Sequence, residues 1–281
     1  MRKGKMKLGP TPTKFRDQCT CDHLISRNAE GQYMPDPDFE GWIGANNALL
    51  MYDRATKYKD VFPAKTRSFD ETIAAFQEFQ GQEDTVKFLY SGAPEIIKAA
   101  KSMKLGHDIS TPGVHESNAL AERVIRRVKE GGRTLMSQSG LGPKWWPSAA
   151  RFMCHADNMK KTFNPDDGQT HSPIGDRTGH HCIAKQICFG QLVEYMPTPK
   201  AGKEQSFAPK TRSGLFVGYH FHSGGRWSGD YYVVDFERLK YYPGSTPGQC
   251  RVHRTKTIVN YDRSRKSSLS ACFPQGLYRE L

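Results

Sequence analysis

One helical stretch, beginning near Asn118, constrains the fold of this chain more than any other segment. Leu120, Val124 and Val128 recur every four residues, so they share one face of a helix, and that face should turn toward a core. A second set of residues lies on the opposite side, at spacings of i, i+4, i+7 and i+11: Glu122, Arg126, Lys129 and Arg133. One carboxylate therefore heads a row of cations along the outer face of a long helix.

This outer face has two interpretations. Glu122 and Arg126 stand four residues apart, and such exposed pairs stabilise a helix by only ~0.2–0.5 kcal/mol. On that interpretation the row is a solvated surface with no further role. On the other, Glu122 binds a metal ion while the cations beside it contact the phosphates of a nucleic acid. The helix alone favours the first interpretation, so the choice depends on the rest of the chain.

The residues before this helix alternate between strand and helix patterns. Four segments have the short apolar or alternating runs that are typical of β-strands: residues 18–25, 48–52, 58–62 and 86–90. Helices are predicted to begin after Ser68, in a capping-box pattern, and at Pro94, with another over residues 145–159. Residues 106–117 are expected to form a polar loop. The order indicates an α/β domain over residues 14–165, with a mixed sheet flanked by helices.

The composition changes after about residue 160. Residues 166–185 have the composition of a linker. Four further strands are predicted beyond it: residues 192–195, 214–219, 231–236 and 252–259. Because glycine turns such as Ser223-Gly224-Gly225 join short strands, we expect a small β-barrel or β-sandwich over residues 186–262. Residues 1–13 have the composition of a basic tail and residues 263–281 that of a disordered basic tail.

An acid, Asp22, stands inside the first predicted strand. A carboxylate in a strand interior is costly to bury unless it is paired or binds a cation. Asp22 could also lie on an edge strand and face water. If the strand and the long helix present Asp22 and Glu122 to one point, the pair suits two-metal phosphoryl transfer.

Several segments resemble a known family. The stretch Ser110-Thr-Pro-Gly-Val-His-Glu-Ser-Asn-Ala-Leu-Ala-Glu122-Arg123 is similar to the block around the last acid of Copia-type retrotransposon integrases, which reads close to S-T-P-x-x-P-Q-T-N-G-x-A-E-R. The positions that match are Ser110, Thr111, Pro112, Asn118, Ala121, Glu122 and Arg123. Residues 19–25 (CTCDHLI) resemble the strand that carries the family's first acid, and residues 215–219 and 224–232 resemble an SH3-like barrel.

The resemblance runs over residues 14–262 and implies an RNase H-like catalytic domain followed by an SH3-like barrel. Such enzymes trim DNA ends and join them to target DNA, using a D-D-E triad and two Mg²⁺ or Mn²⁺ ions. By this resemblance, Asp22 and Glu122 are catalytic and metal-binding acids. It also implies a set of DNA-contacting side chains: Asn118, Arg123, Arg126 and Lys129.

The second acid of the triad is missing. Relatives read Y-S-D-G-A-P-E, whereas residues 90–95 of this chain read Tyr-Ser-Gly-Ala-Pro-Glu, so a one-residue deletion has removed the aspartate. Asp84, Asp108 and Glu95 lie nearby in the sequence, but none stands at the same position. Two divalent cations held close together need carboxylates to offset their charge. We therefore expect weakened metal binding and weak or absent strand transfer.

The charge of the chain favours a polyanionic partner. The formal net charge is +12, and basic residues gather in three separate regions, which suits DNA better than a small metabolite: residues 2–16, 123–133 and 251–266. No apolar run reaches the ~20 residues of a membrane span. The seven cysteines contain no CxxC pair, and His180-His181-Cys182 lacks a second pair of zinc ligands.

These features lead to an expected function with one alternative. We expect an integrase-like protein that binds DNA in the nucleus, or in the cytoplasm before nuclear entry, with homo-oligomerisation left open and no membrane partner. The missing aspartate also fits a decayed or domesticated element. Its product would bind DNA without cutting it, assemble with intact integrases, or have no role at all.

Overall fold

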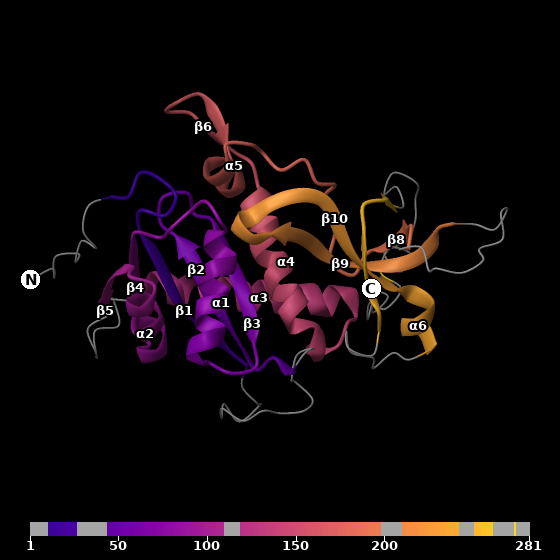
Figure 1. Cartoon of the computed structure of the whole chain (residues 1–281). Helices are drawn as coiled ribbons and strands as arrows, with labels where there is room; N and C mark the ends of the chain where they lie inside the picture. The colour runs from indigo at the N-terminus through magenta and orange to yellow at the C-terminus, as the bar shows by residue number, and fades with distance from the viewer. Residues whose placement is uncertain are drawn as a thin grey trace, which may run out of the picture.

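Two sheets organise the molecule, one from each half of the chain (Figure 1). The computed structural model describes residues 11–26, 44–109, 119–197, 210–241, 250–260 and 273. Most of the two predicted tails therefore lies outside the described residues. Within the described part of the chain, no helix is long and apolar enough to cross a lipid bilayer.

The first sheet has the strand order β3-β2-β1-β4-β5. Its strands are β1 (Cys19–Ile25), β2 (Asn47–Asp53), β3 (Lys59–Ala64), β4 (Phe88–Ser91) and β5 (Gly106–Ile109). The first three strands are antiparallel neighbours, whereas β4 runs parallel to β1 and β5 runs parallel to β4. The predicted mixed sheet is confirmed. Strand β5 replaces the start of the expected polar loop.

Helices cover both faces of this sheet, as expected for the RNase H-like fold class. α1 (Phe69–Gln80) and α2 (Pro94–Ser102) pack on one face, and α3 (Ala119–Ser139) and α4 (Trp146–Met159) pack on the other. α1 begins where its capping box predicts, because Ser68 Oγ accepts a hydrogen bond from the Glu71 backbone N–H. A short 3₁₀ turn, η2 (Pro143–Trp145), precedes α4.

Side chains along β1 alternate between the two faces of the sheet. Cys19 and Cys21 belong to the core beneath α1 and α2. Leu24 instead packs with Val124 and Val128 of α3. Asp22 is two residues from Leu24, so its side chain leaves the strand on the α3 side.

The second sheet is antiparallel, with the order β11-β10-β9-β8-β12. Its strands are β8 (Leu192–Tyr195), β9 (Arg212–His222), β10 (Arg226–Asp235), β11 (Val252–Thr255) and β12 (Ile258–Asn260). The single strand predicted over residues 252–259 is thus two strands, one at each edge. Three Cα–Cα steps, about 11 Å at most, join Thr255 to Ile258. The sheet must therefore curl until its two edges approach each other.

The segment between the sheets is ordered and packed. It contains β6 (Thr162–Asn164), β7 (Gln169–His171) and α5 (Pro173–Thr178), so β7 and α5 fall within the predicted linker. One core runs through both halves of the chain. The ring of Phe152, on α4, stacks on Tyr219 of β9 with centroids 5.9 Å apart.

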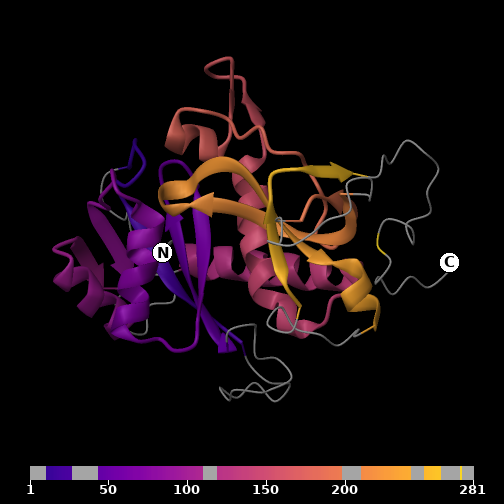
Figure 2. The ribbon, with the colours of Figure 1, turned by 45° about the vertical axis from the view of Figure 1, so that its right-hand side comes forward.

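A glycine contact fixes the second sheet against the first. The β9–β10 hairpin reaches back over α1 (Figure 2), and its turn η3 (Ser223–Gly225) touches the end of that helix. A Cβ atom at Gly81 would lie 2.7 Å from Gly224 Cα, closer than real Cβ contacts allow. Both residues also have positive φ, 76° and 80°. Glycine is therefore required on both sides. Beyond β10 the chain continues into α6 (Phe236–Tyr241).

Candidate metal and nucleic-acid site

Asp22 lies on the central strand of the first sheet. It is half-buried, and its Oδ1 atom accepts a hydrogen bond of 2.8 Å from the His23 backbone N–H. Because β2 and β4 flank β1, the alternative that Asp22 belongs to an edge strand is wrong. The central position is the one that a shared site with α3 requires.

The end of β4 lies beside Asp22. β4 pairs with β1 through Leu89 and Tyr90, opposite Cys19 and Thr20. Extending this parallel register by two residues sets Gly92 level with Asp22. The residue that follows Ser91 therefore comes next to the first acid, and in this chain that residue has no side chain.

The helix pattern read from the sequence is confirmed in α3. Val124 and Val128 are buried, and Leu120 is half-buried against the same cluster. Glu122 is exposed in the first turn of the helix and makes no hydrogen bond or ion pair with any described residue. Because α3 packs on the face toward which Asp22 points, both acids belong to the same side of the sheet. The structure thus brings them to one side through two different elements.

The cations of α3 divide into two kinds. Arg123 and Arg126 are exposed and form no ion pair within the described part of the chain. Lys129 is half-buried, and its Nζ atom donates a hydrogen bond of 3.1 Å to the Ile25 carbonyl at the end of β1. Lys129 thus ties α3 to the strand that carries Asp22. Asn118, the remaining predicted DNA contact, lies outside the described residues.

Glu95 does not stand in for the missing aspartate. Its Oε1 atom lies 3.3 Å from His23 Nε2 and 3.9 Å from Arg67 Nη1. His23 follows Asp22 in the strand, so its side chain and Glu95 are on the opposite face of the sheet. The His23–Glu95 contact lacks hydrogen-bond geometry, so it is electrostatic. Burial lowers the pKa of His23, and the Glu95 charge opposes that effect.

The other two nearby acids are also engaged or distant. Asp84 forms an ion pair of 2.9 Å with Arg16, and Asp108 lies on β5, at the edge of the sheet. Within the described ranges, no group of three or more His, Cys, Asp or Glu side chains is arranged to hold a metal ion. Carboxylates are the donors that Mg²⁺ and Mn²⁺ prefer. Asp22 and Glu122 therefore fit such an ion by type, but they are fewer than a two-metal site needs.

The sequence reasoning missed two charged networks beside these elements. Asp157 of α4 accepts two hydrogen bonds from Arg127, of 2.9 and 2.8 Å, and lies 3.1 Å from Lys59 Nζ. Asp60 of β3 contacts Arg151 and His155, both on α4. Their partners are about 30 to 100 residues apart in the chain, so no local pattern marks them. These networks anchor the helices that surround the candidate site.

Comparisons with known proteins find likeness among solved structures. No protein-family model matches the chain, and no curated protein does. It is similar to the HTLV-2 integrase catalytic core domain in complex with magnesium, at 14% identity and a TM-score of 0.38, covering 56% of this chain and 94% of that one. It is also similar to the BIV integrase catalytic core domain, at 13% identity and a TM-score of 0.38, covering 56% of this chain and 91% of that one.

A third structure covers both halves of the chain. The simian T-cell lymphotropic virus intasome in complex with PP2A regulatory subunit B56 gamma gives 11% identity and a TM-score of 0.44, covering 91% of this chain and 82% of that one. All these identities and TM-scores are too low to carry a function across. The fold class stands on the sheet order and strand directions described above.

Proposed function

We propose that this chain is an integrase-like protein of the RNase H-like superfamily, derived from a Copia-type retrotransposon, that binds DNA and is impaired in metal-dependent strand transfer. One observation carries the proposal. Asp22 on β1 and Glu122 on α3 belong to the same side of the sheet, whereas the position level with Asp22 on the neighbouring strand continuation is Gly92. Two acids remain of the three that the resemblance implies.

The remaining residues have distinct proposed roles. Asp22 and Glu122 would donate carboxylate oxygens to Mg²⁺ or Mn²⁺, which in a complete site activates the attacking hydroxyl and stabilises the leaving oxygen. Arg123 and Arg126, exposed on the same helix as Glu122, would contact DNA phosphates. Lys129 would contribute mainly by holding α3 against β1. Asn118 remains a proposed DNA contact.

The second sheet supports a further part of the proposal. Its two edge strands follow each other in the chain with only Lys256 and Thr257 between them, and the sheet must curl to allow this. Such curling suits the small SH3-like barrel proposed over residues 186–262, behind a catalytic-like domain over residues 14–165. A nuclear location and homo-oligomerisation are parts of the same proposal.

A strand-transfer assay with Mn²⁺ and short DNA ends tests this function. The native chain is compared with a variant that carries an aspartate inserted after Ser91, and with a matched insertion of asparagine. We expect weak activity from the native chain, a clear gain from the aspartate insertion, and no gain from asparagine, because only the carboxylate restores a ligand. The Glu122→Gln change should abolish the gain.

Two outcomes would contradict the proposal. Robust strand transfer by the native chain would mean that the triad is not defective. A folded aspartate-insertion variant that binds DNA but stays inactive would mean that the deletion is not the cause of the defect. Circular dichroism and thermal melting of each variant separate this second outcome from misfolding.

A DNA-binding module without chemistry is the second candidate. It is favoured by the exposed cations Arg123 and Arg126, which have no ion pair to give up among the described residues. Binding to duplex DNA should weaken steeply with salt, and Arg126→Gln should reduce the slope of log affinity against log salt by about 1. Lys101→Gln, at an exposed position of α2, is the control and should leave the slope unchanged. Affinity that ignores salt would exclude this mode.

A further inference from the structure

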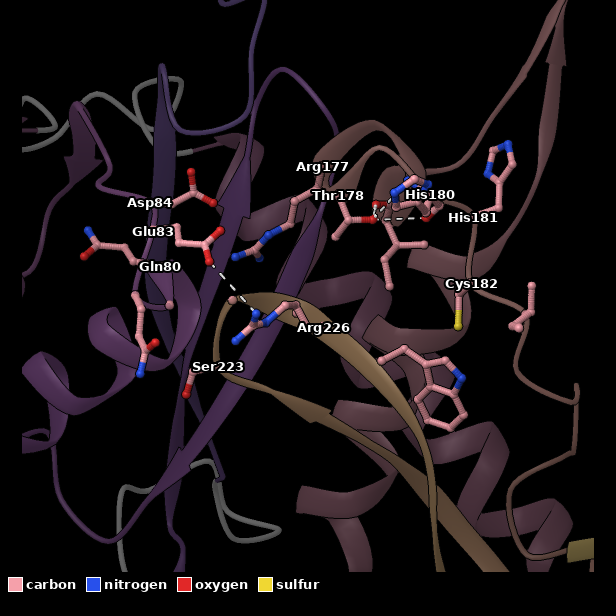
Figure 3. Close-up of a pocket in the computed structure, with 17 residues that line it drawn as sticks. Gln80, Glu83, Asp84, Arg177, Thr178, His180, His181, Cys182, Ser223 and Arg226 are labelled. Carbon is pink, nitrogen blue, oxygen red and sulfur yellow. Dashed lines mark hydrogen bonds and ion pairs between the residues drawn. The ribbon is translucent and has the colours of Figure 1, made fainter. Parts of the chain in front are cut away.

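A cleft of about 720 Å³ opens where the end of α1, helix α5 and the η3 turn meet (Figure 3). None of the residues proposed for metal or DNA binding lines it. Two arginines do, Arg177 from α5 and Arg226 from the start of β10. The cleft is therefore a second charged site, built where the two halves of the chain pack together.

Arg177 supplies a fixed positive charge to the wall of this cleft. Its guanidinium carbon lies 4.0 Å from the ring centroid of Phe15, 4.3 Å from that of Tyr58 and 5.1 Å from that of Phe79. Its Nη2 atom donates a hydrogen bond to the Phe79 carbonyl. Three rings and one carbonyl hold the side chain in a single place, and the cation–π contacts stabilise the guanidinium there.

This guanidinium charge has no carboxylate partner within the described residues. The Nη1 atom of Arg177 is buried and has no hydrogen-bond partner in that part of the chain. It lies under the η3 turn, because a Cβ atom at Gly225 would come within 3.4 Å of it and within 2.6 Å of the Tyr58 hydroxyl. A buried donor without an acceptor is costly, and a nearby anion would offset the uncompensated charge.

Arg226 supplies the exposed charge of this cleft. The Arg226 side chain is 66% exposed, and its one ion pair within the described residues is a 4.0 Å contact with Glu83, whose side chain is 87% exposed (Figure 3). Exposed pairs of this kind contribute little, so a stronger anion can displace Glu83. Asp84, the other acid lining the cleft, already forms an ion pair with Arg16, with 2.9 Å between Asp84 Oδ1 and Arg16 Nη1.

We propose that this cleft binds a phosphate group, held by the Arg226 guanidinium and attracted by the fixed charge of Arg177. Guanidinium groups match phosphate oxygens in charge and geometry. The volume exceeds that of an inorganic ion and leaves room for the group that carries the phosphate. That group is a small phosphorylated molecule or the backbone of DNA. The proposal does not depend on the integrase-like function.

Calorimetric titration of the full chain with inorganic pyrophosphate, in a buffer free of phosphate, tests the cleft. We expect saturable binding of one pyrophosphate per chain. Arg226→Ala should weaken it about tenfold, as expected for loss of a charge-assisted hydrogen bond. Glu83→Gln should tighten it, because the competing carboxylate is removed. Both side chains are exposed, so thermal melting should confirm that both variants fold.

Arg212→Ala is the matched control. Arg212 is 58% exposed and lies 4.0 Å from Asp235, so its setting is like that of Arg226, but it is outside the cleft. It should leave pyrophosphate binding unchanged. Equal weakening by Arg212→Ala and Arg226→Ala, or no saturable heat at millimolar pyrophosphate, would overturn the proposal. If binding is saturable and depends on Arg226, a competition experiment with duplex DNA identifies the source of the phosphate. Displacement of pyrophosphate by DNA assigns the site to the DNA backbone. No displacement by DNA assigns the site to a free phosphorylated ligand.

Discussion

Asp22 and Asp60 are both acids inside strands of the same sheet, yet their surroundings differ. The Asp60 side chain is 6% exposed and lies 3.3 Å from Arg151 Nη2 and 3.4 Å from His155 Nε2. Asp22 is half-buried, and its Oδ1 atom accepts a hydrogen bond from the adjacent His23 backbone N–H. Asp60 also lies on an edge strand, where an exposed acid would be expected. An acid in a strand therefore indicates a metal site only when no cationic side chain of the same protein already neutralises its charge, as Arg151 does for Asp60.

The Asp60 network shows how a buried acid stays charged. Burial alone would raise the pKa of the Asp60 carboxyl, but the charges of Arg151 and His155 outweigh it and lower the pKa to about 2. A backbone hydrogen bond from Val61 acts in the same direction. Arg151 is also bound by Glu78. This carboxylate contributes to stability, and its oxygens are occupied.

Removing the Asp60 charge should produce the largest effect. Asp60→Asn leaves Arg151 with Glu78 as its only remaining carboxylate in the described structure. Breaking a buried pair costs about 3–5 kcal/mol, and we expect about 3 because the Arg151 side chain keeps 31% of its surface exposed. Urea unfolding measures the change. Glu78→Gln, which removes the 40% exposed partner of the same arginine, is the control and should cost less than about 1 kcal/mol.

The same network should limit stability in acid. The folded-state pKa of Asp60 is about 2, below its ordinary value of 3.8, so its contribution to stability is fully present above about pH 4. It is then lost as the pH falls toward about 2. A lowering of the pKa by this amount corresponds to about 2 kcal/mol of stability. Unfolding free energies measured through this range should fall less in Asp60→Asn than in the native chain. Parallel slopes in the two proteins would show that other groups cause the loss.

Most of the first sheet could be predicted because its signals are local. Apolar alternation marks β1, and the four-residue spacing of Val124 and Val128 marks α3. β5 was missed because its four residues, Gly-His-Asp-Ile, are too short and polar to read as a strand. Its pairing with β4 depends on a parallel neighbour from another part of the chain. Parallel pairing of this kind leaves no periodic trace in a short segment.

The candidate site was predictable only where a motif carried it. Glu122 and Asp22 were found because they stand in family-like segments, and the fold then brings their elements together. Nothing local in the sequence connects Arg177 with Phe15, which lies 162 positions earlier. Likewise, the role of Gly225 becomes visible only when Tyr58 is beside it. Such sites are formed by contacts between segments that are distant in the chain, and no local pattern in a single sequence predicts those contacts.

Two surface carboxylates around His171 should have a smaller effect on stability than the buried Asp60 network. His171 lies between two acids, with Nδ1 2.9 Å from Asp176 and Nε2 2.7 Å from Asp167. These hydrogen bonds, first to Asp176 and then to Asp167, raise the pKa of His171. The contribution of these hydrogen bonds to stability is therefore present below about pH 6.5, and it is lost as the pH rises through the raised folded-state pKa of His171. His171→Gln should lower the melting temperature slightly near pH 5.5 and leave it unchanged near pH 9. A deficit of equal size at both pH values would mean that packing, and not charge, is responsible.

The smallest effect on stability should come from removing the Glu122 charge. This variant is also the most direct test of the difference between a metal-binding acid and a structural acid such as Asp60. Glu122 is exposed and has no hydrogen bond or ion pair within the described residues, so Glu122→Gln should change the unfolding free energy by less than about 0.5 kcal/mol. Glu130→Gln, an exposed acid two turns later on the same helix, is the matched control. The two variants should be equally stable without metal. They should differ when Mn²⁺ is added, because only the Glu122 variant loses a proposed ligand and with it part of any Mn²⁺-induced rise in melting temperature. A Glu122→Gln loss as large as that of Asp60→Asn would make Glu122 a structural acid like Asp60, and the distinction between the two kinds of acid would fail.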